Sequence, residues 1–360
     1  MSALLKHQLS ERFASISKTQ AYKHFNRVRV KDSTRYGVPK EYAATYKGQG
    51  GIGTPAQISI QYEYDMLTGK PIVLELTSGC RNDQQDSKET LDNIEKGDLL
   101  IRDLAYTSQS YIEHVSKAKA YYLNRFNPKW KLYDKSGELI DFSKISKRLN
   151  KYSLPLIELD AFITIGQQRL ATRLIVSKVD NQTYSKRLAK AQIAAASKGY
   201  QLSERFKTCA AMSLFITNIP RQWLKTKEVR QAYGLRWQIE LIFKVWKSQA
   251  NIHKVKAMKI QRFQCQLLAR LIWILIHWKM LRTIQDWLTI SRKRKHYQCS
   301  VWKFYKVAFR LSGLLRQVFS GRKSSYFWIS ELAKKAERKY LTEARGNRVG
   351  PQTVLYNLLA

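Results

Sequence analysis

The sequence predicts an α/β fold with a mixed β-sheet, and three observations support this prediction. Residues 27–77 contain three strand-like segments in succession, and residues 84–126 alternate between helix-like and strand-like patterns. The apolar fraction of 44% is high enough for a large packed core. Three strands followed by helix, strand, helix and strand are typical of an α/β domain.

The elements of the first 126 residues follow from hydrophobic period and turn chemistry. Strand segments alternate or run apolar, and the stretch DMLTGK at residues 65–70 is a turn between two of them. A short basic segment, residues 1–26, precedes the first strand and is expected to be helical. The strands are expected at residues 27–31, 57–64, 71–77, 99–102 and 120–126, and the helices at residues 84–95 and 108–118.

The pattern changes after residue 126. Residues 127–208 read as a β-rich insertion that does not continue the sheet, and a strand and a helix complete the interrupted α/β domain in residues 209–250. A basic helical region, residues 251–360, follows. Strands are expected at 131–133, 156–165, 169–178 and 210–217, a helix at 228–250, and a long, nearly all-round apolar helix at 264–288.

Charge narrows the classes of function. The chain has 64 Lys and Arg against 27 Asp and Glu, a formal net charge of +37. Because such a field attracts polyanions, nucleic acid is the expected partner, and an anionic membrane surface is the lesser alternative. Residues 292–295 (RKRK) open a more basic tail, and we expect them to contact phosphates non-specifically. The alternative, a solvated surface turn, fits the sequence equally well.

Other classes are not expected. The four cysteines stand apart and no His-x-x-x-His pair occurs, which argues against zinc and leaves carboxylates as catalytic groups. The longest uncharged apolar stretch, residues 271–278, is far short of the ~20 residues that cross a bilayer. No hydrophobic signal region begins the sequence, so we expect a cytoplasmic, nucleoid-associated protein without a membrane segment.

Four reactive side chains fall on one face of the helix expected at residues 228–250. At ~100° per residue, Tyr233, Arg236, Glu240 and Lys247 fit within an arc of ~60°. A carboxylate among cations suits a metal ion beside a phosphate, whereas the alternative is an ordinary surface network of ion pairs.

Asp32 and Asp103 are expected at the carboxyl ends of strands, where active sites of open α/β sheets form. Each has a simpler alternative as a turn or cap residue. With Glu240 they could hold two Mg²⁺ or Mn²⁺ ions for phosphodiester chemistry. Other strand-flanking carboxylates compete with them, and each could equally be a turn residue: Asp65, Asp83, Asp86 and Asp98.

The spacing Tyr233-x2-Arg236-x3-Glu240-x6-Lys247 resembles the YREK signature of DDE transposases from bacterial cut-and-paste insertion sequences. The blocks KDSTRYGVP at residues 31–39 and GDLLIRDLAYTS at residues 97–108 resemble the family's two Asp blocks, in the same order. The similarity covers residues 27–250.

The resemblance implies a ribonuclease H-like catalytic domain with an insertion before the helix that bears Glu240. It implies that Asp32, Asp103 and Glu240 bind two metal ions. It also implies that Tyr233, Arg236 and Lys247 contact the phosphates of the DNA. Trp237 matches an Arg-Trp pair of the family and would stack on a distorted base or pack in the core. The implied activity is cleavage at transposon inverted-repeat ends and strand transfer by a homodimer on DNA.

The sequence departs from the family pattern at two places. Only 31 residues precede Asp32, so we expect the DNA-binding region to be truncated. Leu104 and Ala105 follow Asp103 where Arg-Gly is common. Two alternatives therefore stay open: a metal-dependent DNA nuclease of the same fold without strand transfer, and a truncated DNA-binding remnant that inhibits intact transposase.

Overall fold

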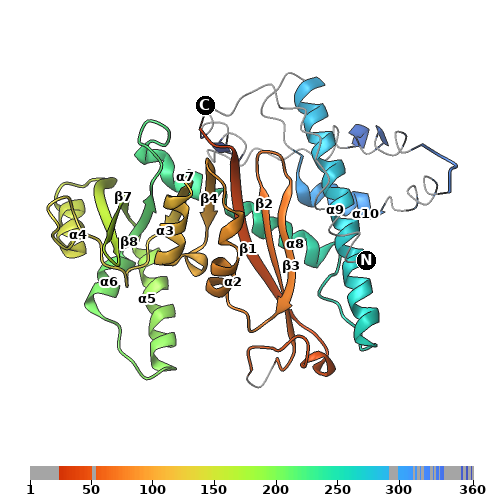
Figure 1. The fold of residues 1–360 in the computed structure, drawn as a ribbon, viewed down its shortest axis with the longest axis horizontal. Coiled ribbons are helices and arrows are strands. Elements are labelled where there is room, and N and C mark those ends of the chain that lie inside the picture. The colour runs from red at the N-terminus through yellow and green to blue at the C-terminus, as the bar shows by residue number, and fades with distance from the viewer. Residues whose placement is uncertain are drawn as a thin grey trace. The chain divides into compact units, whose positions relative to one another are not determined.

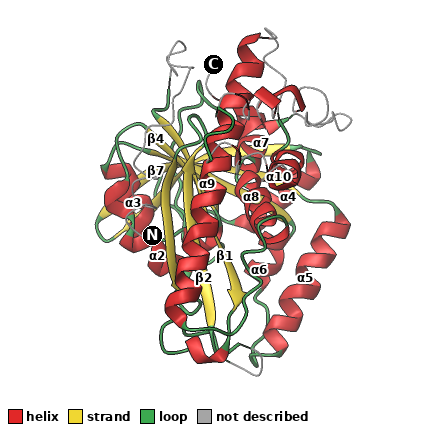
Figure 2. Cartoon of the chain, turned by 90° about the vertical axis from the view of Figure 1, so that its right-hand side faces the viewer, coloured by secondary structure: helices red, strands yellow, loops and turns green. Residues whose placement is uncertain are grey.

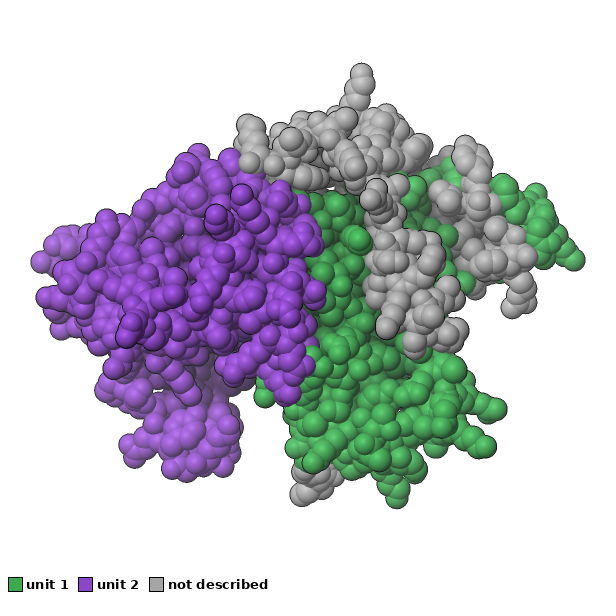
Figure 3. Space-filling model, in the orientation of Figure 1, with its two compact units in different colours: residues 1–23, 29–82, 235–360 green, residues 24–28, 83–234 purple. Residues whose placement is uncertain are grey.

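The computed structural model describes residues 24–50, 54–291 and 299–310, together with isolated positions between 313 and 358. The chain divides into two compact units (Figure 3). Among the described residues, unit 1 contains residues 29–82 and those from 235 onward, and unit 2 contains residues 24–28 and 83–234. Each unit has strands and helices of its own.

The strands of unit 1 form an antiparallel meander in the order β3-β2-β1, drawn in red to orange in Figure 1. They span Arg27–Gly37 (β1), Gln57–Asp65 (β2) and Pro71–Ser78 (β3). The turn between β2 and β3 is set by Asp65, whose carboxylate accepts from the backbone N–H groups of Leu67 and Thr68. This confirms the meander and the turn expected at residues 65–70.

Three helices pack with the meander in unit 1. They span Trp237–Ser248 (α8), Ile260–Ser291 (α9) and Val301–Arg310 (α10), and Figure 2 shows α9 as the long helix among them. Tyr62 of β2 meets Trp246 of α8 with ring centroids 4.9 Å apart. The indole of Trp278 on α9 donates to the Gly69 carbonyl oxygen at 2.6 Å.

Gly69 also shows why this turn needs a glycine. Its φ is +74°, and a Cβ there would lie 2.7 Å from the Arg282 side chain. The long apolar helix predicted at residues 264–288 is confirmed as part of α9. Its middle turns are buried on several sides, because Ile272, Leu275 and His277 point in different directions around the helix and are at most 8% exposed.

Unit 2 contains the strand order β4-β5-β8-β7-β6. β4 and β5 pair in parallel, and the remaining neighbours pair antiparallel, so the sheet is mixed as the sequence predicts. The strands span Asp98–Arg102 (β4), Tyr121–Arg125 (β5), Leu156–Ile165 (β6), Gln168–Lys178 (β7) and Met212–Thr217 (β8).

Helices surround these strands and enclose one apolar core, with Tyr111, Ile112 and Val115 of α3 fully buried in it. Short turns of 3-10 helix join several elements, of which Leu104–Tyr106 (η3) and Thr226–Glu228 (η4) matter for the site. The α-helices span Asp83–Glu89 (α2), Gln109–Lys117 (α3), Phe142–Lys151 (α4), Asn181–Ala196 (α5), Glu204–Ala210 (α6) and Val229–Gly234 (α7).

The structure corrects two expectations about the strands. β1 does not end before Asp32 but continues to Gly37, because residues beyond Asp32 stay paired with β2 as far as the Gly37–Gln57 partners. Residues 131–133 form no strand; Tyr133 makes isolated bridges to Leu139 and Phe162.

The segment 127–208 also differs from its prediction. Its two long strands, β6 and β7, join the strands of unit 2 through β8, so they continue that sheet. Three helices, α4, α5 and α6, lie in the same segment. Apolar residues of the β6–β7 hairpin such as Ile163 and Leu174 are fully buried in the core of unit 2, which is why the hairpin extends the sheet.

Helix boundaries differ as well. The helix expected at residues 84–95 is α2 followed by a separate 3-10 turn, Leu91–Asn93. The helix expected at residues 228–250 is divided into α7 and α8 around Leu235 and Arg236. Gly234 closes α7, and glycine is the poorest helix former after proline. The basic segment before residue 24 and residues 292–295 lie outside the described residues.

Within the described helices, none is both long and apolar enough to cross a membrane.

Candidate active site

Asp32 lies in the middle of β1, directly opposite Tyr62 of β2. Side chains of directly opposed residues lie on the same face of a sheet, and Tyr62 packs against Trp246, so Asp32 occupies the face that α8 covers. The Asp32 carboxylate is 20% exposed and accepts from the Ser33 backbone N–H at 2.8 Å. Its turn-residue alternative is wrong because the residue is in a continuous strand.

Arg236 joins Asp32 to Glu240. Its Nη1 donates to Asp32 Oδ2 at 3.2 Å, and its Nη2 donates to Glu240 Oε1 at 2.6 Å. Arg236 precedes α8 and Glu240 lies in the first turn, where the helix dipole favours a negative charge. The two carboxylates, 204 and 4 residues from Arg236 along the chain, therefore converge on one cationic group.

The side chains that converge here can be compared with the ligands that a divalent metal ion prefers. Asp32 and Glu240 supply carboxylate oxygens, the ligands that Mg²⁺ and Mn²⁺ prefer, and both already face one positive charge. The donor chemistry of this pair fits such an ion. No group of three or more His, Cys, Asp and Glu side chains forms a metal site among the residues that the structure describes.

Lys247 contacts the backbone rather than a carboxylate. Its Nζ donates to the carbonyl oxygen of Arg35 on β1 at 3.0 Å. The side chain is half-buried, and burial lowers the pKa of the ammonium from its usual value. The contact ties the last turn of α8 to the strand that carries Asp32, and an ammonium has three donors, so it does not prevent a phosphate contact.

Asp103 follows β4 in unit 2, as expected. It precedes η3, but its side chain makes no cap hydrogen bond there, so the helix-cap alternative is wrong. Its Oδ1 accepts instead from the phenol of Tyr233 on α7 at 3.3 Å. The centroid of the Tyr233 ring lies 5.2 Å from that of Phe215 on β8, so the two aromatic rings pack together.

The six predicted residues thus fall into two groups. Unit 1 brings together Asp32, Arg236 and Glu240, with Lys247 on the same helix; unit 2 brings together Asp103 and Tyr233. The single helical face of residues 233–247 is wrong, since Tyr233 belongs to α7. The part of that prediction at the start of α8 holds, because Arg236, directly before the helix, and Glu240 in its first turn are four residues apart and form an ion pair.

Trp237 is 56% exposed, so the core-packing alternative is wrong. It lies beside Arg236 at the start of α8, and the neighbouring turn exposes 48% of Leu241. An exposed indole next to the carboxylate pair is open to a flat ligand group.

Three of the four competing carboxylates have structural partners that account for them. Asp65 shapes the β2–β3 turn, and Asp98 is fully buried in an ion pair with Arg27 at 2.6 Å. Asp83 accepts from the phenol of Tyr106 at 3.3 Å.

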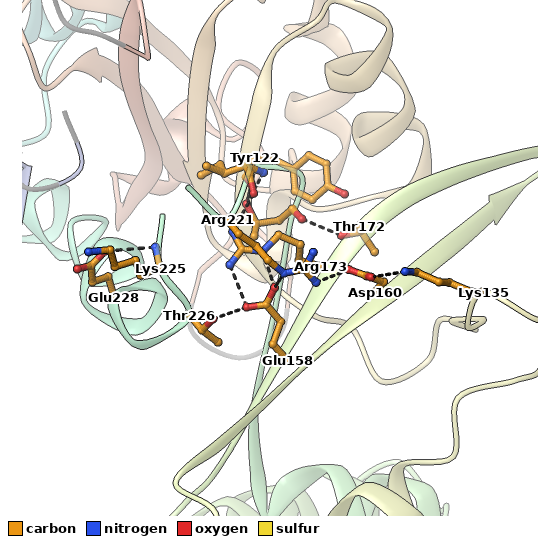
Figure 4. Close-up of polar contacts among 12 residues, drawn as sticks. Tyr122, Lys135, Glu158, Asp160, Thr172, Arg173, Arg221, Lys225, Thr226 and Glu228 are labelled. Carbon is orange, nitrogen blue, oxygen red and sulfur yellow. Dashed lines mark hydrogen bonds and ion pairs between the residues drawn. The ribbon is translucent and has the colours of Figure 1, made fainter. Parts of the chain in front are cut away.

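Sequence reasoning missed a polar cluster centred on Glu158 of β6 (Figure 4). Glu158 accepts from both Nε and Nη2 of Arg173 on β7, at 2.9 and 3.0 Å. Glu158 and Asp160 alternate with apolar residues on β6, and this alternation beside an arginine-bearing strand was the only signal in the sequence.

Comparisons with known proteins show the family of this chain. The family described as transposase DDE domain matches residues 23–276. The transposase for insertion sequence element IS231B of Bacillus thuringiensis subsp. berliner is 32% identical over 308 residues, covering 82% of this chain and 64% of the relative. The corresponding IS231E transposase of Bacillus thuringiensis subsp. finitimus is 30% identical over 309 residues, with the same coverage.

A more distant relative is the transposase for insertion sequence element IS1151 of Clostridium perfringens, 28% identical over 326 residues, or 83% of this chain and 69% of the relative. The chain thus spans 64% of the length of the IS231 transposases it matches. Because the family match extends over well more than half of its residues, this chain belongs to the transposase DDE domain family.

Proposed function

We propose that this chain is a transposase that cleaves DNA at the ends of an insertion sequence and transfers the strand to a target. The observation that carries the proposal is the convergence of Asp32 and Glu240 on Arg236, in a member of the transposase DDE domain family. The curated relatives are named as transposases of insertion sequence elements. The excess of positive charge supports double-stranded DNA as the substrate.

In this proposal Asp32, Asp103 and Glu240 hold two divalent ions, Mg²⁺ or Mn²⁺. When bound, such ions lower the pKa of a nucleophilic oxygen and stabilise the leaving oxygen of a phosphodiester. Arg236 keeps the Asp32 and Glu240 carboxylates facing one point, and the Tyr233 phenol orients the Asp103 carboxylate.

DNA contacts complete the proposal. Arg236, with its planar fork, suits a bidentate phosphate contact, and Lys247 and Tyr233 supply a point charge and a hydroxyl donor. Trp237, exposed beside Arg236, offers a face on which a distorted terminal base can stack. We propose a homodimer that holds two inverted-repeat ends of the element together.

The test of the site is Glu240→Gln, which keeps the shape of the side chain and removes its charge. We expect Mg²⁺-dependent cleavage of end DNA to be lost while the affinity for the same DNA is retained. Glu204→Gln is the matched control, because Glu204 is exposed on α6 and its ion pair is with Lys207, three residues away. Undiminished cleavage by the Glu240 variant rejects the assignment of this residue.

A second measurement separates transposase from nuclease. DNA flanking the gene is searched for inverted repeats, and an oligonucleotide of one such repeat is incubated with the protein, Mg²⁺ and a target plasmid. A transposase produces a covalent joint between the oligonucleotide and the plasmid. Nicks without any joint support the nuclease, and binding without nicks supports the DNA-binding remnant.

A further inference from the structure

Glu158 is the centre of a buried joint in unit 2. Its side chain is 10% exposed and that of Arg173 is 8% exposed. Besides Arg173, the Glu158 carboxylate contacts Arg221 Nε at 2.5 Å and accepts from the Thr226 hydroxyl at 2.5 Å. Asp160, two residues further along β6, also contacts Arg221 and accepts from Lys135 at 2.8 Å (Figure 4).

The charged groups at the centre of this joint form their hydrogen bonds with other groups of the protein. The third guanidinium nitrogen of Arg173, Nη1, donates to the Ile219 carbonyl oxygen at 2.8 Å, so each of its nitrogens has a protein partner. A hollow of about 430 Å³ borders the joint. Because every guanidinium nitrogen of the buried Arg173 donates to a protein acceptor, the cluster connects segments of the chain rather than binding an anion.

The fastened segment is the connection from β8 to α7, residues 218–228. At its start, the Asn218 side chain accepts from Tyr122 N at 2.8 Å and donates to Ala120 O at 2.9 Å. Ile219 is held by Arg173, as described above. Arg221 and Thr226 then both contact Glu158, so one carboxylate of β6 holds the connection at two points.

α7 follows this connection directly. Thr226 opens η4, whose last residue, Glu228, accepts from the Lys225 N–H, and α7 begins at Val229. Val229 is fully buried and Ala232 nearly so, which leaves α7 little freedom once its start is held. Tyr233, at the far end of α7, then reaches Asp103.

We propose that Glu158 is a positioning residue that sets α7, and through it the Tyr233 phenol, against the Asp103 carboxylate. The β6–β7 hairpin of the segment 127–208 thereby helps to fix the Asp103–Tyr233 contact within unit 2. The effect of Glu158 on catalysis rests on the proposed function, whereas its effect on the position of Tyr233 does not.

The first arm of the test measures position without activity. The full chain carries 3-fluorotyrosine at position 233, and its ¹⁹F resonance is compared among Glu158→Gln, Asp160→Asn and Asp103→Asn. Asp103→Asn shows the shift caused by altering the partner of the phenol. We expect Glu158→Gln to move the resonance in the same direction and Asp160→Asn to leave it within the line width.

Asp160 is the matched control because it is a carboxylate on the same face of β6 that also contacts Arg221. It lies opposite Arg173 in the β6–β7 ladder, but the Arg173 guanidinium and the Thr226 hydroxyl direct their hydrogen bonds to the Glu158 carboxylate. An unmoved resonance in folded Glu158→Gln overturns the proposal. So does an equal shift in Asp160→Asn, which indicates general loosening of the hairpin.

The second arm uses DNA cleavage. We expect Glu158→Gln to lower the cleavage rate roughly 10- to 100-fold, as a small misplacement of a reacting group does, with DNA affinity unchanged. In a Tyr233→Phe background the same substitution should have almost no further effect, because the phenol through which it acts is gone. Independent, multiplying effects of the two substitutions overturn the proposal.

Two further measurements distinguish failure of this proposal from misfolding and from failure of the proposed function. If Glu158→Gln does not fold, Thr226→Val is used, since it removes one hydrogen bond onto Glu158 and leaves the arginine pairs intact. We expect Thr226→Val to move the ¹⁹F resonance in the same direction by a smaller amount; no movement overturns the proposal. A wild-type chain that cleaves no DNA rejects the proposed function, and the ¹⁹F arm still decides the role of Glu158.

Discussion

Replacing Glu63 with Gln should destabilise unit 1 strongly, because Glu63 forms a completely buried ion pair beside the strand segment that carries Asp32. Its two carboxylate oxygens accept from Nε and Nη2 of Arg29 at 3.1 and 3.0 Å, and both side chains are 0% exposed. Lys31, also 0% exposed, is the direct cross-strand partner of Glu63. A neutral amide removes the negative charge that the buried Arg29 guanidinium faces.

The size of the effect follows from this burial. Removing one member of a buried pair costs about 3–5 kcal/mol, a large share of the roughly 5–15 kcal/mol by which domains are stable. The thermal midpoint should fall by about 10 °C. Glu75→Gln is the control, since its carboxylate is 45% exposed and 3.3 Å from Arg81, and it should cost less than about 1 kcal/mol.

The assay is urea and thermal unfolding followed by circular dichroism, with both variants measured beside wild type. Arg29→Met combined with Glu63→Leu should recover part of the loss, because two apolar side chains need no charge partner. A loss of less than about 1 kcal/mol in Glu63→Gln, equal to that of Glu75→Gln, refutes the reasoning about buried charge.

Three further predictions concern single side chains. Burial lowers the pKa of His277 to about 4, below the ~6.5 of an unfolded histidine, so only the unfolded chain gains this proton between these values. The free energy of unfolding should therefore fall by about 2 kcal/mol from pH 7 to pH 5. In thermal unfolding scans, His277→Phe should remove this contribution to the pH dependence of stability. The control His253→Gln, at an exposed histidine, should retain it. Trp237→Ala should weaken binding to end DNA in fluorescence anisotropy without lowering the thermal midpoint, because the side chain is 56% exposed; a lower midpoint with unchanged affinity contradicts it. A thiol reagent followed by mass spectrometry should modify the exposed Cys80 and Cys265 quickly and the two buried cysteines only on unfolding; four equal rates contradict this burial.

Much of the fold could be predicted because its signals are local. Alternating residues in β2, the turn after Asp65 and the apolar run of α9 depend on neighbours within a few residues. The position of Asp103 after β4 is a signal of the same kind. The pairing of Arg236 with Glu240 likewise followed from helical spacing alone.

Other features depend on residues far apart in the chain. β1 continues past Asp32 because residues 57–62 pair with it, although the sequence pattern predicted that the strand ends at residue 31. The division of the helix at Leu235 placed Tyr233 apart from Glu240, which periodicity over the whole segment does not show. The hairpin β6–β7 joined the sheet because β8, over 30 residues later, pairs with β7.

The sequence by itself determined the α/β class, the order of the acidic blocks and the cationic character of the chain, since each depends on residue type and short spacing. Only the tertiary structure decided which side chains meet. Arg236 meets Asp32 across 204 residues, Tyr233 meets Asp103 across 130, and Thr226 meets Glu158 across 68. The physical reason is that a hydrogen bond or an ion pair needs its atoms within about 3 Å, and only the packing of strands and helices brings distant residues so close.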